Sequence, residues 1–350
     1  MIHLHDPAQL AAHCRELRVD PQHGERLARL VLREGQSVDA ALARLRGEVP
    51  RAWSDALARD VLALERREDS AADGATKLLF RTSSGAPLES VVLRAASGRR
   101  TLCLSIQSRC PIGCRFCASG SLGKVPPVGL EELLDQVVQA RRLLAAEGGA
   151  LRNLVFMGMG EPLLEEELLH AALERLLDSR GFGFGPSRVC VSTVGLPGGM
   201  SRLAARFPGV RQALSLHAAR PEVRERLIPV ARTHGLDELR DAVREVGERT
   251  SGRVLVEVLL LDGVNDGPED EAALAAWLEG LPVRLNLIPY NAPGVLPEDG
   301  TLDLTLRPTP RVRCEAWAAA FRARGVETTL RRSLGADVAA ACGQLAARRD

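Results

Sequence analysis

Short apolar runs alternate with amphipathic helical segments from residue 101 onward, and this alternation restricts the fold more than any other feature of the sequence. Six runs have the length and composition of buried strands: LCLSI (102–106), NLVFM (153–157), RVCVS (188–192), ALSL (213–216), VLVEVLLL (254–261) and RLNLI (284–288). One apolar helical face lies between the first two strands, formed by Leu130, Leu133, Val137, Ala140 and Leu144. Such repeats predict an α/β fold in which an all-parallel sheet, buried on both sides, closes as a partial (β/α)6 barrel. VETTLR (326–331) extends it as a seventh strand.

The beginning of the chain has a different pattern. Residues 1–70 carry helical signals only, in GERLARLVLREG (24–35), SVDAALARLRGEV (37–49) and RAWSDALARDVLALERRED (51–69). Residues 76–94 predict a hairpin, because two β-prone runs flank a Ser-Ser-Gly turn signal. We therefore predict a small helical accessory domain over 1–72, a β-hairpin linker over 73–100, and the partial barrel with a C-terminal extension over 101–350.

Charge and composition exclude some classes of protein. The net charge of +1 gives no bulk electrostatic reason to expect a nucleic acid or a membrane as partner. The start MIHLHDPAQL lacks the basic segment and apolar core of a secretion signal, and no uncharged apolar run reaches membrane-spanning length. The eight cysteines are clustered and unevenly spaced, which favours metal ligands or catalytic thiols over a disulfide frame. We expect a cytoplasmic protein.

Three cysteines, Cys110, Cys114 and Cys117, follow a C-x3-C-x2-C spacing directly after the first predicted strand. Thiolates in such groups bind zinc or iron–sulfur clusters. Zinc would need a fourth ligand, for which His217 is the candidate, whereas a cubane 4Fe–4S cluster on three cysteines keeps one iron without a protein ligand. That iron can be chelated by the amine and carboxylate of S-adenosylmethionine. The spacing favours the cluster, and core packing explains three cysteines on one loop less well.

Further polar residues fall at the carboxyl ends of the predicted strands. The turn GMGEP (158–162) follows the second strand, and Ser192 ends the third. His217 follows the fourth strand and Asn291 follows the sixth. In β/α barrels the chemistry is carried at this edge. We therefore expect these residues to meet the cysteine loop at one rim of the barrel.

The cysteine motif after the first barrel strand resembles the signature of the radical S-adenosylmethionine superfamily. More narrowly, the chain resembles the RlmN/Cfr family of RNA methyltransferases over nearly its whole length. The similarity rests on CRFCASG (114–120), GMGEPLL (158–164), VSTVG (191–195), SLHAARPEVRERLIPV (215–230), LLLDGVND (259–266), NLIPYN (286–291) and AACGQL (340–345). It implies a radical S-adenosylmethionine barrel with one 4Fe–4S cluster on the three cysteines. It also implies that S-adenosylmethionine is bound by Gly160, Glu161, Ser192, Ser215, Leu216, His217 and Asn291.

The resemblance also implies a use for two cysteines outside the motif. Ring carbons 2 and 8 of adenine are not nucleophilic enough to attack a methyl sulfonium directly. In the family's scheme one S-adenosylmethionine methylates a cysteine thiolate, which matches Cys342, and a second yields the radical that activates this methyl group. The carbon then joins the adenine and Glu89 accepts the ring proton. Cys103 finally frees the product by forming a transient disulfide with Cys342.

The implied substrate is an adenosine of 23S ribosomal RNA, methylated at carbon 2 or carbon 8, with transfer RNA as a second candidate. The implied partner is a reductant such as flavodoxin or ferredoxin, and we expect a monomer. Two alternatives stay open: a radical enzyme that acts on a non-RNA substrate, and a non-catalytic zinc-bearing RNA-binding protein. No role is assigned to Cys14, Cys190 or Cys314, and Cys190 is expected to be a packing residue.

Overall fold

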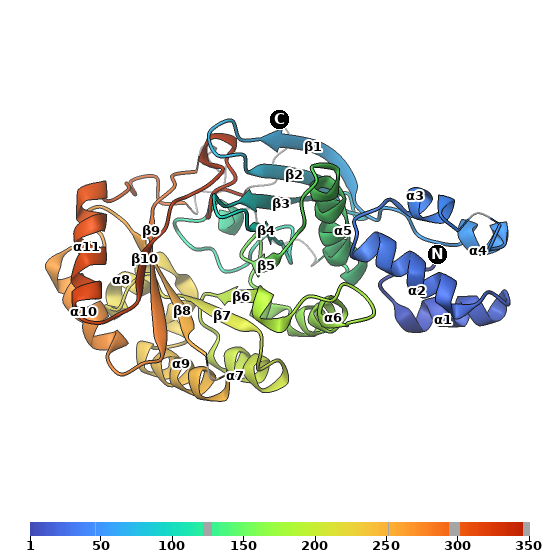
Figure 1. The fold of residues 1–350 in the computed structure, drawn as a ribbon. Helices are drawn as coiled ribbons and strands as arrows, with labels where there is room; N and C mark the ends of the chain where they lie inside the picture. The colour runs from blue at the N-terminus through green and yellow to red at the C-terminus, as the bar shows by residue number, and fades with distance from the viewer. Residues whose placement is uncertain (46, 122–127, 251, 294–301, 346–350) are drawn as a thin grey trace.

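One ten-stranded sheet follows the chain, with its strands paired in sequence order (Figure 1). The structure is a computed structural model that describes residues 1–45, 47–121, 128–250, 252–293 and 302–345. The strands are β1 (Ala63–Asp69), β2 (Thr76–Arg81), β3 (Pro87–Arg94), β4 (Arg100–Cys103), β5 (Asn153–Phe156), β6 (Val189–Thr193), β7 (Arg211–Ser215), β8 (Val254–Leu260), β9 (Val283–Pro289) and β10 (Thr328–Leu330). The α-helices are α1 (Pro7–Glu16), α2 (Pro21–Leu32), α3 (Val38–Ala43), α4 (Arg51–Asp55), α5 (Leu130–Ala146), α6 (Glu166–Leu177), α7 (Pro197–Arg206), α8 (Pro221–Leu227), α9 (Leu236–Thr250), α10 (Pro268–Leu278) and α11 (Arg311–Ala323).

Strands β4 to β10 run parallel to one another. They include the six predicted strands and the predicted seventh, which is reduced to Thr328–Leu330. The sheet curves into an open barrel, and the helices that connect its parallel strands lie on the outer side (Figure 1). The predicted α/β class and the partial barrel are therefore confirmed.

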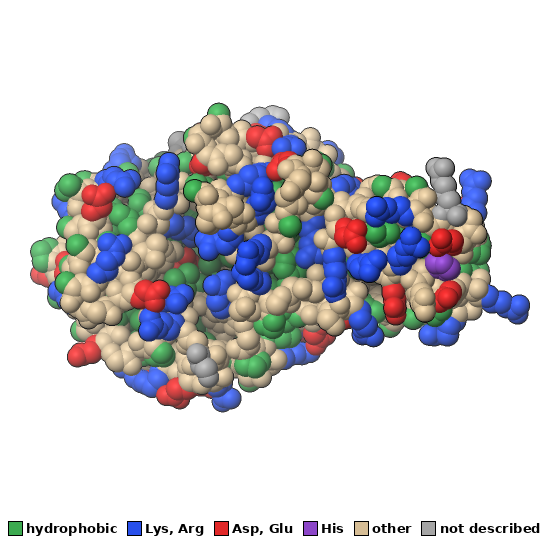
Figure 2. Space-filling view, in the orientation of Figure 1, with side chains coloured by type: hydrophobic (Ala, Val, Ile, Leu, Met, Phe, Trp, Pro, Cys, Tyr) green, Lys and Arg blue, Asp and Glu red, His purple; other side chains and the backbone are tan. Residues whose placement is uncertain are grey.

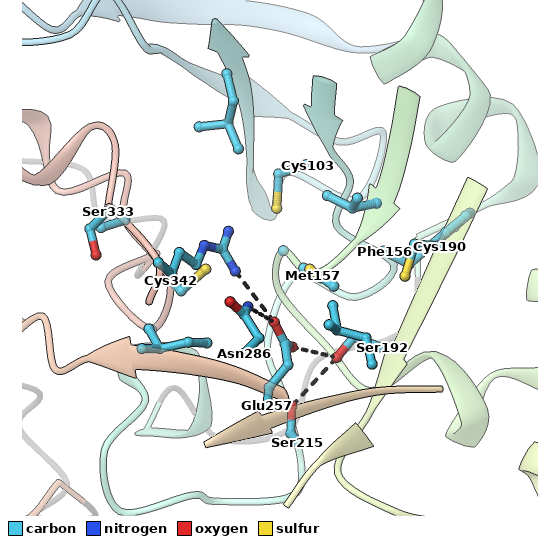
Figure 3. Close-up of a pocket in the computed structure, with 18 of the residues that line it drawn as sticks. Cys103, Phe156, Met157, Cys190, Ser192, Ser215, Glu257, Asn286, Ser333 and Cys342 are labelled. Atoms are coloured by element: carbon cyan, nitrogen blue, oxygen red, sulfur yellow. Dashed lines mark hydrogen bonds and ion pairs between the residues drawn. The ribbon is translucent and has the colours of Figure 1, made fainter. Parts of the chain in front are cut away.

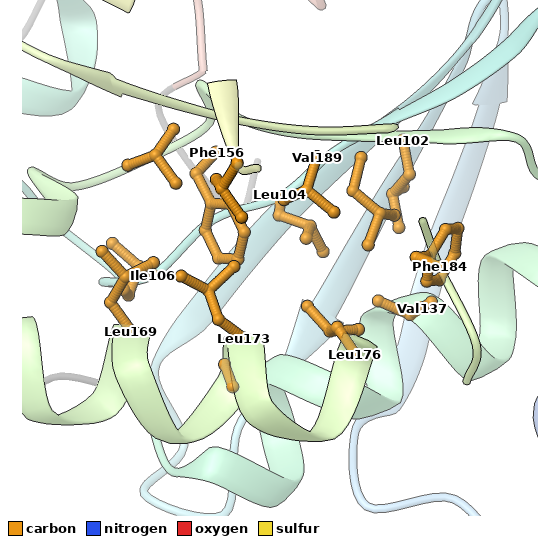
Figure 4. Close-up of a cluster of buried hydrophobic side chains, with 14 of the residues drawn as sticks. Leu102, Leu104, Ile106, Val137, Phe156, Leu169, Leu173, Leu176, Phe184 and Val189 are labelled. Atoms are coloured by element: carbon orange, nitrogen blue, oxygen red, sulfur yellow. The ribbon is translucent and has the colours of Figure 1, made fainter. Parts of the chain in front are cut away.

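The outer face of the barrel is closed by the apolar stripes of its helices. Leu133, Val137, Ala140 and Leu144 of α5 are fully buried, as their spacing predicts. Figure 4 shows how α6 adds to this layer, because its Leu169, Leu173 and Leu176 face side chains of β4 and β5 and the residues after them. This core fixes the strands from outside and keeps the inner face of the barrel available for a site.

The six predicted barrel strands are all parallel, but the sheet also contains antiparallel strands, because the hairpin joins the same sheet. The hairpin over 76–94 forms as predicted from β2 and β3, but β3 then pairs antiparallel with β4, with Val91 opposite Cys103. The connection from β3 to β4 is a short turn closed by a hydrogen bond from Ala95 N to Arg99 O (2.9 Å). A turn of this length can only return the chain antiparallel, whereas a parallel connection needs a long crossover.

The predicted helix over 51–69 is correct only in its first part. Helix α4 ends at Asp55, and Ala63–Asp69 form β1, which pairs antiparallel with β2. The sequence ALERRED favours a helix, but most of its side chains are exposed or half-buried at the sheet edge, so no alternation marks the strand. Backbone pairing with β2 decides its conformation, since tertiary context overrides helix propensity.

Helices α1 to α4 form a separate layer beside α5 and α6 (Figure 1). Helix α1 begins where Asp6 accepts hydrogen bonds from the N–H groups of Ala8 (3.1 Å) and Gln9 (3.0 Å), and Pro7 occupies its first turn. An ion pair of 3.2 Å from Arg175 of α6 to Asp6 holds this layer against the barrel. The division of the chain into three domains stays a prediction. Among the described residues, no helix has the length and apolar character needed to cross a membrane.

Candidate active site

A cavity of about 630 Å³ occupies the inside of the barrel. Side chains from β3 to β9, and from the segment that follows β10, line it. Glu257, on β8, lines the same cavity. Figure 3 shows that the sulfur atoms of Cys103 and Cys342 point toward the middle of the cavity. Two residues far apart in sequence therefore meet in one enclosed space.

The three cysteines of the motif lie on the loop after β4. Cys117 lines the cavity, whereas the described lining does not include Cys110 or Cys114. All three pack in or against an apolar cluster that contains Phe116 and Leu227. Burial raises the pKa of the Cys110 thiol to about 12, and Cys117 adds to the effect. Burial, followed by the two other cysteines, also raises the pKa of Cys114 well above its ordinary value. The three thiols are thus mutual neighbours in a medium of low polarity.

This donor set fits an iron–sulfur cluster. Within the described residues, no three His, Cys, Asp or Glu side chains come close enough together to hold a single metal ion. Sulfur ligands of one tetrahedral zinc ion lie about 3.8 Å apart, whereas the cysteines of a cluster bind separate irons. Buried thiols must lose their protons to bind metal, and the iron atoms of a cluster supply positive charge that stabilises the thiolates. Cys110, Cys114 and Cys117 would hold such a cluster, with Cys117 nearest to the cavity.

Cys342 lies on a C-terminal segment, residues 331–345, that is fastened to the cysteine loop. Ala118 N donates to Gly343 O (2.8 Å), and Ser119 Oγ donates to Leu345 O (2.7 Å). Burial first, and Cys342 second, raise the pKa of Cys103 to about 12. All eight cysteines are free thiols, so the disulfide expected during turnover is not formed in this structure.

The turn GMGEP is held against the residues that follow β4. A Cβ on Gly160 would lie 2.7 Å from Gln107 Cβ, and the backbone φ there is +100°, so only glycine fits without strain. Glu161 N donates to Gln107 Oε1 (2.9 Å), and the Glu161 carboxylate accepts from Val194 N (2.9 Å). Burial raises the pKa of Glu161 to about 7. Gly160 and Glu161 both line the cavity, as expected of a cofactor cradle.

His217 is held as a neutral ring at the end of β7. Its backbone φ is 60°, an uncommon conformation for a residue other than glycine. Leu259 N donates to His217 Nδ1 (3.1 Å), which places the ring proton on Nε2. Burial first, and the charge of Arg224 second, lower the pKa of His217 to about 3. The ring is therefore uncharged and can offer one N–H to a ligand.

The other predicted cofactor residues are divided between the cavity and the surrounding packing. Ser192 and Ser215 line the cavity, with their hydroxyl oxygens 3.4 Å apart. Leu216 is fully buried, and the described cavity lining does not include its side chain or that of Asn291. Asn291 Nδ2 is buried and has no hydrogen-bond partner among the described residues, so this donor is available to a ligand.

A buried polar group that the sequence analysis did not identify lies inside the barrel. Glu257 of β8 is 4% exposed and accepts from Asn286 Nδ2 (3.1 Å) and from Ser192 Oγ (3.4 Å). Arg331 lies 3.4 Å from the same carboxylate (Figure 3). The charge of Cys342 is the largest influence that raises the pKa of Arg331, so the guanidinium lies close to both groups. The only signal in the sequence is a Glu and an Asn inside otherwise apolar strands.

Glu89 lies on β3, on the same face as the cavity-lining Val91 and Leu93, and is 3% exposed. The described cavity lining does not include it. Lys77 Nζ lies 3.6 Å from Glu89 and 2.7 Å from Glu68, which links three neighbouring strands through one cation. Cys190, expected to be a packing residue, is buried but lines the cavity as well.

The comparisons with known proteins agree with this geometry. Residues 104–275 match the radical SAM superfamily. A probable RNA methyltransferase of Rhodopirellula baltica is 43% identical over 98% of this chain and 87% of its own length. A probable dual-specificity RNA methyltransferase RlmN of Thermus thermophilus is 40% identical over 85% of this chain and 82% of its own length. The crystal structure of a radical SAM methyltransferase from Sphaerobacter thermophilus superposes with a TM-score of 0.89 at 32% identity, and covers 99% of this chain and all of that one.

The chain belongs to the RlmN/Cfr family of radical S-adenosylmethionine RNA methyltransferases. It is therefore an enzyme that uses S-adenosylmethionine and an iron–sulfur cluster, and its substrate is RNA. The family and the class of enzyme that the sequence motifs indicated are therefore confirmed.

An RlmN/Cfr enzyme must guide RNA to its cavity, and exposed arginines surround one opening. They are Arg99, Arg211, Arg253, Arg284 and Arg332, and all of them contribute to the cavity lining. Figure 2 shows Lys and Arg side chains around a hollow near the middle of this face. The near-neutral net charge thus contains a local basic surface, which is what phosphate contacts need.

Proposed function

We propose that this enzyme methylates a ring carbon of adenosine, carbon 2 or carbon 8, in 23S ribosomal RNA and in transfer RNA, through an S-methylated Cys342. One observation carries the proposal: Cys342 and Cys103 line the same cavity as Cys117 of the cysteine motif. A radical enzyme for a non-RNA substrate has no use for two further thiols in its cavity. The name "dual-specificity RNA methyltransferase" of the Thermus relative supports two classes of RNA substrate.

The residues of the cavity have separate tasks in this proposal. A 4Fe–4S cluster on Cys110, Cys114 and Cys117, with S-adenosylmethionine bound to it, supplies the electron and the carbon radical when both are present. Cys342 takes up the methyl group as a thiolate, beside the guanidinium of Arg331. Cys103 attacks the sulfur of Cys342, and the bond from that sulfur to the transferred carbon breaks. The carbon keeps the electron pair and takes up a proton to become the methyl group of the product, while the two sulfurs form a disulfide.

The buried polar group around Glu257 is suited to hold the adenine. A base that leaves its stack is usually read through hydrogen bonds to its edge. Glu257 accepts hydrogen bonds, Arg331 donates them, and Asn286 does both, so together they match the amino group and ring nitrogens of adenine. Ser192 binds Glu257 from the side of the proposed cofactor site. Substrate and cofactor would then meet in front of Cys342.

Glu89 remains the proposed acceptor of the ring proton. The residue lies on the cavity face of β3, and Lys77 Nζ lies 3.6 Å from its carboxylate. We further propose that the exposed arginines and helices α1 to α4 hold the RNA backbone. The enzyme would act as a monomer in the cytoplasm, and a flavodoxin or ferredoxin would reduce its cluster.

Mass spectrometry of 23S ribosomal RNA and transfer RNA, from cells with and without the gene, tests this proposal. We expect one methyladenosine to disappear from each pool without the gene, and to return with the wild-type gene but not with C342A. Tryptic peptides of the purified enzyme should carry one methyl group on Cys342. Unchanged adenosines in both pools would refute the RNA assignment, and a colourless protein with stoichiometric zinc would support the zinc-bearing alternative.

A further inference from the structure

Arg224 of α8 is a buried cation whose surroundings do not balance its charge. It is 2% exposed, and its Nη2 donates to Val194 O at 2.5 Å. Its Nε and Nη1 have no hydrogen-bond partner, and it makes no ion pair, among the described residues. Because an unpaired buried charge costs several kcal/mol, such a group calls for an anion that the chain itself does not supply.

Arg141, which is also buried, and Arg331, which is half-buried, show the difference. Arg141 donates to Leu32 O and Phe182 O, and it lies over the ring of Phe184 with its guanidinium carbon 4.2 Å from the ring centre. Arg331 is paired with Glu257. Each of these cations has partners that account for its burial, whereas Arg224 has one backbone carbonyl.

The surroundings of Arg224 include the cysteine loop. Arg224 is not among the described residues that line the cavity. Burial lowers the pKa of Arg224 to about 10, and the charge of Cys114 acts against this effect. Helix α8 is also joined to the loop, because Arg115 N donates to Leu227 O (2.9 Å). Leu227 packs in the same apolar cluster as Cys114.

We propose that Arg224 is the fixed counter-charge of the iron–sulfur cluster and raises its reduction potential. Three thiolates outweigh the positive charge of an oxidised cubane core, and the added electron increases the negative charge further. A buried guanidinium at Cys114 stabilises the reduced form more than the oxidised one. The inference rests on the 4Fe–4S cluster of the proposed function. It makes Arg224 a positioning residue that acts on the electron-transfer step and does not touch the substrate.

Anaerobic redox titration of the reconstituted enzyme, followed by electron paramagnetic resonance of the reduced cluster, tests the proposal. We expect R224M to bind iron and sulfide as the wild type does. At any fixed potential the ratio of reduced to oxidised cluster in R224M should fall at least tenfold. This corresponds to a midpoint potential that is lower by about 59 mV for a one-electron couple. R224K keeps the positive charge, so its midpoint potential should lie close to that of the wild type. A midpoint of R224M equal to that of the wild type would overturn the proposal.

Arg226, two residues further along the same helix, gives a matched control. Its side chain is 57% exposed, so R226M should leave the midpoint unchanged. Thermal unfolding of the cluster-free variants reports on packing. If R224K and R224M both failed to fold, Arg224 would be a packing residue and the proposal would be wrong. A shifted midpoint in an enzyme that methylates no RNA would keep this inference and refute the proposed function alone.

Discussion

Cys103 and Cys342 differ in their surroundings although they share a cavity. Cys103 is 7% exposed on β4, and burial makes its thiolate unfavourable. Cys342 is half-buried on the C-terminal segment, where Arg331 is close. A thiol that must react first with S-adenosylmethionine benefits from a neighbouring cation. A thiol that must wait for the RNA adduct is better kept protonated, which suits Cys103 for the later step.

Replacing Cys103 by alanine should therefore trap the reaction before product release. In C103A the methyl carbon can still join the adenine, but no thiol is left to free it from Cys342. We expect an RNA–protein adduct that survives denaturing electrophoresis and is absent from the double variant C103A/C342A. C314A, which changes a buried cysteine of α11 outside the cavity, should form no adduct. Multiple turnover by C103A would contradict the assigned role.

Gly160 should resist substitution because of its backbone and its close neighbours. In G160A the new Cβ would lie 2.7 Å from Gln107 Cβ at a φ of +100°, and we expect a loss of about 1–3 kcal/mol in the free energy of unfolding. Binding of S-adenosylmethionine, measured by equilibrium dialysis, should weaken as well. The control is G280A, where φ is +71° but nothing lies within 4 Å of the new Cβ. Its cost should be about 1 kcal/mol, with unchanged cofactor binding.

The sequence motifs singled out the cysteines and GMGEP, which the structure brings to one region, but they assigned no role to Glu257, Asn286 or Arg331. The first group stands out because glycines, prolines and clustered thiols are unusual at strand ends. The second group lies within strands or just after one, where an isolated polar residue resembles an outward-facing side chain. Only the curvature of the sheet turns these residues toward the same interior, and that curvature is not encoded in any short stretch.

At the scale of elements, periodicity predicted the parallel strands and the helices that carry continuous apolar faces. It did not predict β1, because edge strands need no apolar alternation and ALERRED reads as a helix. A long-range contact fixes this segment: Asp135 of α5 accepts hydrogen bonds from the N–H groups of Val61 (3.0 Å) and Leu62 (2.9 Å). The chain is thereby held by α5 just before it enters the sheet.

Asp135 should make the stability of the cluster-free protein depend on pH. Burial raises its pKa from 3.8 to about 6. Because the pKa of Asp135 is higher in the folded than in the unfolded state, its contribution to stability is complete below about pH 4. This contribution is lost as the pH rises through 6, and the free energy of unfolding falls by at most about 3 kcal/mol. We expect D135N to remove this slope in urea unfolding measured between pH 4 and pH 7. The exposed D241N serves as control, and equal slopes in wild type and D135N would contradict the prediction.

At the scale of the whole molecule, the cavity has two chemically different ends. The cysteine motif, Glu161 and His217 follow the carboxyl ends of strands. Arg211 and Arg284 lie at the amino ends of β7 and β9, and Arg253 directly precedes β8. The cofactor and the RNA backbone would then approach from opposite ends, and the base would enter the barrel between them.

Removing arginines at the amino ends of the barrel strands should weaken RNA binding without changing the binding of the cofactor. We expect R99A/R211A to lower RNA affinity and to reduce the slope of log K against log salt by roughly 0.7–0.9 for each phosphate that an arginine no longer neutralises. The measurement is fluorescence anisotropy with an RNA hairpin at several salt concentrations. R311A, on the exposed start of α11, should leave the slope unchanged. Unchanged affinity in R99A/R211A would place the RNA elsewhere.

The C-terminal segment joins the two edges of the open sheet. After β10 it meets the turn between β1 and β2, where Ser70 Oγ donates to Asp337 Oδ1 (2.7 Å) and Gly335 N donates to Asp73 Oδ2 (2.8 Å). It then reaches the cysteine loop at Ala118. The gap in the barrel cannot widen without stretching these bonds or displacing Cys342. In the proposed reaction Cys342 carries the methyl group, so widening of the barrel and displacement of this sulfur would occur together. A ligand that holds the two edges apart would then reduce methyl transfer without contacting the cofactor.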